Sequence, residues 1–263
     1  MEKLFGKIKR NANTVDLEEQ ATVIPGTINH IDADTEPFNG RSKSMIKAIF
    51  LDFYGTVVHE DDVAAEIAAR RIAVSAGTET EAVRSRWTEI FRQMSATAHG
   101  ENFETQRVLE MRSMAEAIRQ FGAEEDAVRL CEEIFPLWTK PPIFPDAAPF
   151  FAGCPVPVYF VSNIDNADIT ACIAHHGLSP AGVFTSEDAR SYKPRPELFR
   201  LALDNTGVSP CEVLHVGDSL INDVRGAGRL GITAIWLNRE EKPVPDGVQA
   251  VRTLSELLCR NWI

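Results

Sequence analysis

The sequence predicts an α/β protein in which a doubly wound, parallel, Rossmann-like sheet carries an inserted all-α unit. Short apolar runs that end at polar or glycine residues alternate with amphipathic helical patterns, which is typical of parallel strands joined by helices. Between the first and second apolar runs, however, four helical patterns follow one another without a strand. We therefore expect a core domain formed by residues 45–58 and 146–263, and a helical domain at residues 59–145.

The composition is that of an ordinary globular chain. Hydrophobic residues make up 44% of its 263 residues and charged residues 25%, which favours neither a disordered nor a membrane protein. A formal net charge of −11 without a basic patch argues against a nucleic-acid partner. We find no run that approaches the roughly 20 apolar residues of a membrane span, and no apolar signal segment at the start. The five cysteines lack CxxC spacing, and we interpret them as reduced thiols in a cytoplasmic protein.

Residues 1–44 differ from the rest of the sequence. A short basic start leads into polar and acidic residues with Pro, Gly and Asn, and neither helical nor strand periodicity is sustained. This pattern predicts a disordered N-terminal extension, with Met45 as the start of the compact part of the chain.

The first strand and the helical unit follow from apolar patterns. The run from Ile46 is apolar on both faces and ends at Asp52, as expected of a buried parallel strand. In the first helix, we expect Val63, Ile67 and Val74 to form the buried stripe. Four amphipathic helices are predicted, at residues 61–76, 80–97, 102–121 and 125–138.

A proline-rich stretch around residues 141–149 ends the helical unit, and the alternation of strands and helices resumes after it. The next strand, at residues 156–161, ends at Ser162 and Asn163. Further helices are predicted at 167–176, at 196–206 and from Asn222, and further strands at 213–216 and 232–237. This alternation indicates that the strands are parallel.

Polar residues follow three of these strands directly. Because the active sites of such sheets lie outside the carboxyl ends of the strands, Asp52, Ser162 and Asp218 are expected to meet in one crevice. Carboxylates brought together in this way need a cation or raised pKa values. Mg²⁺ is the expected solution, because it suits carboxylates together with phosphate oxygens. Lys193, which precedes a helix, offers the same crevice a fixed positive charge.

These residues resemble the four motifs of haloacid dehalogenase superfamily hydrolases, in the same order and over roughly residues 46–237. The resemblance implies that Asp52 attacks the substrate to form an aspartyl intermediate, and that Ser162 and Lys193 bind phosphate and orient the nucleophile. It also implies that the helical unit is a mobile cap over the site. The matching segments are Asp52-Phe53-Tyr54-Gly55-Thr56, Ser162-Asn163, Lys193-Pro194-Arg195-Pro196, and Gly217-Asp218-Ser219 with Asp223.

The resemblance implies a magnesium-dependent phosphatase that acts on a small phosphorylated metabolite. No membrane partner is expected, and the sequence leaves the oligomeric state open. The implied catalytic residues are Asp52, Ser162 and Lys193. The implied substrate-binding residues are Tyr54, Gly55, Thr56, Ser162, Asn163 and Lys193. The implied magnesium ligands are Asp52, the carbonyl of Tyr54, Asp218 and Asp223.

One position departs from the phosphatase pattern. Phosphatases of this superfamily carry a second aspartate two residues after the nucleophile as the general acid and base, whereas this chain has Tyr54. A tyrosine there resembles the metal-independent 2-haloacid dehalogenases, so dehalogenation is an alternative. Phosphonate cleavage, a catalytically weak binding protein, and a replacement acid or base at His59 or Glu60 are further alternatives.

Overall fold

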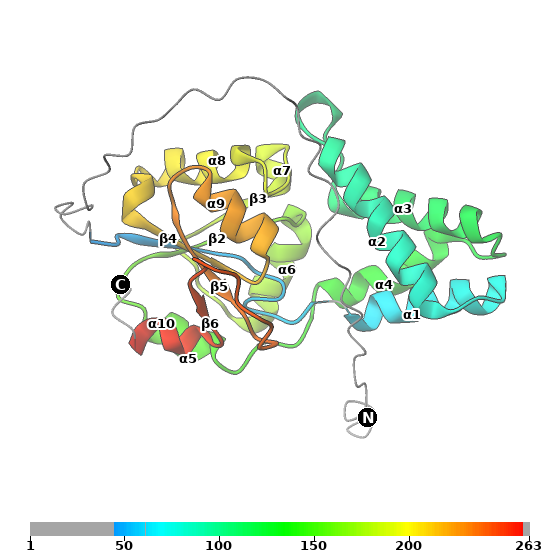
Figure 1. Ribbon diagram of the computed structural model, residues 1–263, viewed down its shortest axis with the longest axis horizontal. Coiled ribbons are helices and arrows are strands. Elements are labelled where there is room, and N and C mark those ends of the chain that lie inside the picture. Colours follow the sequence, from blue (N-terminus) through cyan, green and yellow to red (C-terminus); the bar gives the residue numbers. More distant parts are fainter. Residues whose placement is uncertain (1–44, 61, 260–263) are drawn as a thin grey trace. The chain divides into compact units, whose positions relative to one another are not determined.

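The structure is a computed structural model that describes residues 45–60 and 62–259. Its sheet has the strand order β3-β2-β1-β4-β5-β6, with every neighbouring pair parallel (Figure 1). The predicted parallel α/β fold is therefore confirmed, while the prediction for residues 1–44 lies outside the described part. The strands are β1 (Ala48–Leu51), β2 (Val158–Ser162), β3 (Gly182–Thr185), β4 (Val213–Gly217), β5 (Thr233–Leu237) and β6 (Ala250–Val251).

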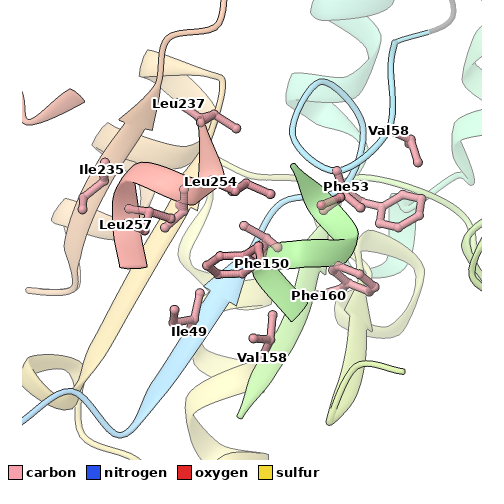
Figure 2. Close-up of a cluster of buried hydrophobic side chains, with 14 of the residues drawn as sticks. Ile49, Phe53, Val58, Phe150, Val158, Phe160, Ile235, Leu237, Leu254 and Leu257 are labelled. Atoms are coloured by element: carbon pink, nitrogen blue, oxygen red, sulfur yellow. The ribbon is translucent and has the colours of Figure 1, made fainter. Parts of the chain in front are cut away.

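Helices cover both faces of the sheet because its strands are apolar on both sides. Ile49 and Leu51 of β1 belong to one hydrophobic cluster, and Ala48 and Phe50 to another. The first cluster includes α5 (Ala147–Gly153), α6 (Asn166–His176) and α10 (Leu254–Cys259), and the second includes α8 (Pro196–Thr206) and α9 (Gly226–Gly228). Figure 2 shows side chains of β1, β2, β5, α5 and α10 gathered in the first cluster.

Four helices between β1 and β2 form what we call the helical insertion. It has a hydrophobic cluster of its own, which includes Ile72, Trp87, Met114 and Leu130. In the described residues, no helix has the length and apolar character needed to cross a bilayer. The division of the chain into core and cap domains at residues 59 and 145 stays a prediction. The helices are α1 (Asp62–Ala76), α2 (Thr80–Thr97), α3 (Gln106–Phe121) and α4 (Ala127–Trp138).

The stripe predicted to be buried on α1 was wrong. Val63, Ile67 and Val74 are 58%, 42% and 76% exposed. The buried face instead carries Ile72 and several alanines, among them Ala64, Ala68, Ala69 and Ala73. Both stripes have helical spacing, and the sequence argument chose the more apolar one, although small side chains let neighbouring helices approach closely.

The third helix of the insertion starts at Gln106 rather than at residue 102. Its first two N–H groups, of Gln106 and Arg107, donate to the carboxylate of Asp165 in the core. The free N–H groups at the start of this helix are therefore bound by a residue distant in sequence, and no local pattern could show this.

Several short elements were not predicted from the sequence. Helix α5 lies in the proline-rich stretch, where Pro149 occupies the first turn and removes no intrahelical hydrogen bond. The edge strands β3 and β6 and helix α7 (Ser186–Ala189) have at most four residues each, too few to show a period. The helix expected from Asn222 begins earlier, as a π-helical segment at Leu220–Arg225.

Candidate active site

The candidate site lies at the carboxyl end of β1, between β2 and β4, where the order of the strands reverses. Asp52 follows β1 directly, and its backbone N–H donates to the carbonyl of Val216 over 2.9 Å. The carboxylates of Asp52, Asp218 and Asp223 each offer an oxygen within 4.8 Å of the others. The structure thus brings together the three acids singled out in the sequence.

Lys193 lies between Asp52 and Asp223 and is 4% exposed. Its Nζ donates to Asp52 Oδ1 over 2.7 Å, to Asp223 Oδ1 over 2.6 Å and to the Val161 carbonyl over 2.8 Å. Burial alone would lower the pKa of Lys193, but the charges of Asp223 and Asp52 outweigh it and raise this pKa above its usual value. The ammonium group is therefore a permanent charge with all three of its hydrogens used.

Asp223 is held by the π-helical segment that follows β4. Its Oδ2 accepts the backbone N–H of Ser219 over 2.9 Å, and its Oδ1 accepts from Lys193. A Cβ at Gly217 would lie 2.3 Å from this carboxylate, so only glycine fits there. Burial would raise the pKa of Asp223, but Lys193 and a hydrogen bond from His215 hold it below its usual value.

Asp218 has no comparable partner. No residue in the described part of the chain donates a hydrogen bond to its carboxylate, which lies against the loop after β1. A Cβ at Gly55, where φ is +76°, would be 2.5 Å from its Oδ2. Burial, followed by the charges of Asp52 and Asp223, raises the pKa of Asp218 to about 8.

The donor set fits a hard divalent cation. Burial also raises the pKa of Asp52, and the charge of Asp223 adds to this although Lys193 opposes it. Asp52 and Asp218 are neighbours, and both have raised pKa values. This indicates a local excess of negative charge, which a cation would compensate. The oxygens of Asp52 and Asp218 are the ligand type that Mg²⁺ prefers. Asp223 is less available, because both of its oxygens already accept hydrogen bonds.

The residues expected to bind substrate have different surroundings. Ser162 ends β2 and is 3% exposed. Thr56 is fully buried, and its Oγ1 has no hydrogen-bond partner among the described residues. The amide of Asn163 is occupied by the backbone of Lys193, to which it donates over 3.0 Å and from which it accepts over 2.7 Å. Asn163 therefore positions Lys193, and its contact with a substrate stays a prediction.

Tyr54 occupies the place of the second aspartate, but its hydroxyl points to the helical insertion. That hydroxyl donates to the carbonyl of Trp138, the last residue of α4, and its ring packs edge-on against Phe53. Of the two replacement candidates, His59 stacks on Phe144 with ring centroids 3.8 Å apart. Glu60 is exposed, and its charge contributes to the raised pKa of Asp218.

Two further residues at the site were missed from the sequence. His215 lies fully buried in β4 and bonds to Asp223; a histidine that interrupts an otherwise apolar strand was the signal for it. Arg239 donates to the carbonyl of Thr56 over 2.6 Å and binds both oxygens of Asp146. It lies two residues after the end of β5, so its position after a strand could have indicated it.

The helical insertion also contacts the core away from this site. Asp165 accepts the first N–H groups of α3, over 2.7 Å from Gln106 and 3.0 Å from Arg107. The guanidinium group of Arg107 binds both oxygens of Asp168, which is fully buried, and lies over the ring of Phe135. We call these residues the α3 contact.

Comparison with known proteins identifies the family. The chain is 26% identical to (S)-2-haloacid dehalogenase 4A of Burkholderia cepacia over 82% of this chain and 96% of that protein. It is 34% identical to a phosphoserine phosphatase of Thermus thermophilus, over 46% of this chain and about half (51%) of the phosphatase. The L-2-haloacid dehalogenase structure of Xanthobacter autotrophicus, 21% identical, shares the fold with a TM-score of 0.65 over 82% of this chain and 98% of that one.

These relatives include a phosphatase and dehalogenases, so they set the class of enzyme but not the bond that is broken. The family model for haloacid dehalogenase-like hydrolases matches residues 46–231, and this match spans more than half of the chain. The chain therefore belongs to the haloacid dehalogenase-like hydrolase family.

Proposed function

We propose that this hydrolase is a magnesium-dependent phosphatase of a small phosphorylated metabolite, with Asp52 as its nucleophile. The observation that carries the proposal is the carboxylate of Asp218. It lies beside Asp52 with its pKa raised to about 8, and no described residue donates to it. A reaction without a metal would gain nothing from this second acid, whereas a divalent cation would need it as a ligand.

Charge balance supports the same proposal. The site has three carboxylates, of Asp52, Asp218 and Asp223, and Lys193 is the one ammonium group bonded to them in the described residues. A bound Mg²⁺ would restore the balance and neutralise the charge of a phosphoryl group. Asp52, Asp218 and the carbonyl of Tyr54 are the groups that we expect to hold it.

The chain's own residues would carry the covalent step. Lys193 fixes Asp52 through Oδ1, which leaves Oδ2 to attack phosphorus. A bond from Oδ2 to phosphorus forms as the bond from phosphorus to the leaving oxygen breaks. Water then attacks the aspartyl phosphate, releasing phosphate and restoring Asp52. Ser162 is expected to donate to a phosphate oxygen, and the helical insertion is expected to act as a cap that excludes water.

The leaving group would receive little help from a general acid. The hydroxyl of Tyr54 donates to Trp138, and a phenol with a pKa near 10 is a weak acid and base at neutral pH. We therefore expect aryl or acyl phosphates, whose leaving groups depart readily, to react faster than alkyl phosphates.

Metal-independent dehalogenation of a 2-haloacid is the second candidate. Tyr54 favours it, as does the relative in Burkholderia cepacia, which is a haloacid dehalogenase matched over 96% of its length. In that reaction, Asp52 would displace halide from carbon and form an ester. Asp218 would then have no task, and this is why we place the candidate second.

One assay separates the two candidates. Purified protein is given an aryl phosphate, a panel of sugar and nucleotide phosphates, and short 2-haloacids, each with Mg²⁺ and with a chelator. We expect phosphate release that requires Mg²⁺ and is absent in Asp52→Asn. Halide release in the chelator, without phosphate release in either condition, would overturn the phosphatase and establish the dehalogenase.

A further inference from the structure

His215 is a polar residue in an apolar place. It is the middle residue of β4 and is fully buried, and its ring lies nearly perpendicular to that of Phe199 with centroids 4.9 Å apart. Burying a polar ring without hydrogen bonds is unfavourable, so a buried histidine needs a partner. Its Nδ1 has no partner among the described residues, so the side chain makes its hydrogen bond through Nε2.

That bond joins His215 to Asp223. The distance between Nε2 and Asp223 Oδ1 is 3.0 Å. The same carboxylate accepts from the ammonium of Lys193 and from the backbone N–H of Ser219, two groups that can only donate. The carboxylate is thus an acceptor on both oxygens, and the proton of this contact lies on Nε2 of His215.

The contacts continue from Asp223 to the nucleophile. Lys193 divides its three hydrogens between Asp223, Asp52 and the carbonyl of Val161. If the carboxylate of Asp223 turned, Lys193 would lose its ion pair with Asp223. Its ammonium group could then move away from Asp52. The N–H of Ser219 holds Oδ2 of Asp223, and His215 holds Oδ1 independently of Lys193. The bond from His215 therefore opposes a turn of the carboxylate that would carry Oδ1 away from Lys193.

We propose that His215 is a positioning residue, which holds Asp223 so that Lys193 keeps Asp52 aligned for attack. This inference rests on the proposed role of Asp52 as nucleophile, and it holds for attack on phosphorus or on carbon. His215 touches neither substrate nor metal in this arrangement. Its effect is therefore expected in kcat rather than in KM.

The test compares two replacements with a packing control. His215→Leu fills most of the space but donates nothing, whereas His215→Gln can present an N–H near the place of Nε2. Phe199→Leu disturbs the packing around the same ring without touching Asp223. Each variant is measured for kcat, KM and thermal unfolding, and the crystal structures of the histidine variants are determined.

We expect His215→Leu to lower kcat about 10- to 100-fold with KM within about twofold. His215→Gln should recover most of that loss, and Phe199→Leu should lose stability while kcat stays within about twofold. If His215→Leu does not fold, His215→Asn replaces it, because the shorter amide cannot reach Asp223 and the same loss is expected. A kcat within about twofold of wild type in the folded variant, or a loss that Gln does not recover, would overturn the proposal.

The structures keep this test separate from the proposed function. If the wild-type protein releases neither phosphate nor halide, the proposed function fails, but the position of Lys193 can still be measured. We expect Nζ to leave hydrogen-bond distance of Asp52, about 3 Å, in His215→Leu and to remain there in His215→Gln. An unmoved Nζ in His215→Leu would overturn the positioning role whatever the activity.

Discussion

The carboxylates at the end of β1 and those of the α3 contact are all buried except that of Asp218, which is half-buried, yet their charges are balanced differently. At the α3 contact, Asp165 receives two backbone N–H groups and Asp168 receives a guanidinium group. At the end of β1, Asp52 and Asp223 share Lys193, and no described residue donates to Asp218. Burial of acids therefore does not by itself mark a site. A shortage of donors does, because it leaves a place for a cation.

The largest expected effect is that of Asp52→Asn. Removing the attacking oxygen should lower kcat by about 10³-fold or more, because no other described group could replace it. The amide oxygen can still accept from Lys193, so the midpoint of thermal unfolding should change little. A folded variant that keeps more than about a tenth of the activity would show that Asp52 is not the nucleophile.

Breaking the α3 contact should affect stability more than chemistry. Arg107→Ala leaves the buried Asp168 without its cation and should lower the free energy of unfolding by about 2 kcal/mol, allowing for the partial exposure of Arg107. The double variant Arg107→Ala with Asp168→Asn should lose less than the sum of the two single variants. Denaturant unfolding measures both, and kcat should stay within about tenfold of wild type.

The activity of Arg107→Ala also tests whether the α3 contact differs in function from the site at the end of β1. If Arg107→Ala lowered kcat as far as Asp52→Asn does, with the protein still folded, the α3 contact would belong to the catalytic site. The difference between carboxylates with and without hydrogen-bond donors would then not distinguish a catalytic site from a structural contact.

Asp218→Asn should stabilise the protein when metal is removed, although it should abolish metal-dependent activity. The pKa of Asp218 is raised from 3.8 to about 8 by folding, so the folded state binds more protons than the unfolded state between these values. The stability of the metal-free protein should therefore fall as pH rises through that window. At pH 7, Asp218→Asn should regain about 1–2 kcal/mol.

Denaturant unfolding in a chelator at pH 5 and pH 8 measures this difference. The wild-type protein should be the less stable at the higher pH, the difference should shrink in Asp218→Asn, and added Mg²⁺ should restore the wild type alone. If the stability of the two proteins depended equally on pH, the pKa of Asp218 would not be raised by folding.

The smallest expected effect is that of Tyr54→Phe. The hydroxyl of Tyr54 bonds to Trp138 rather than to the nucleophile, so phosphatase activity should stay within about threefold of wild type. The rates for a series of aryl phosphates should depend steeply on the leaving group in both proteins. A loss of a hundredfold or more would place the hydroxyl in the reaction and would strengthen the dehalogenase alternative.

Local pattern was enough to predict the four central strands of the sheet and the acids that follow two of them. Apolar runs that stop at Asp52 and Asp218 show both the strand and the position of the carboxylate, because parallel strands end at one edge. Lys193 was found through the motif that contains it. The partners of these residues could be inferred only as a group, since the sequence does not say which carboxylate Lys193 meets.

What could not be predicted depends on contacts between distant residues. The start of α3 is satisfied by Asp165, which is 59 residues away from Gln106. The role of His215 depends on a carboxylate that the π-helical segment turns back toward β4. The buried face of α1 depends on how closely its alanines let other helices approach, which apolar character alone does not reveal.

The most direct test of the central claim is to follow oxygen-18 from labelled water through many turnovers, with an aryl phosphate and Mg²⁺ or with a 2-haloacid as substrate. If Asp52 attacks phosphorus, water cleaves the aspartyl phosphate at phosphorus. Mass spectrometry should then find the label in the released phosphate and not in the peptide that contains Asp52. Label in the carboxylate of Asp52, together with halide release from the haloacid, would contradict the account, because an ester of Asp52 is cleaved at its carbonyl carbon.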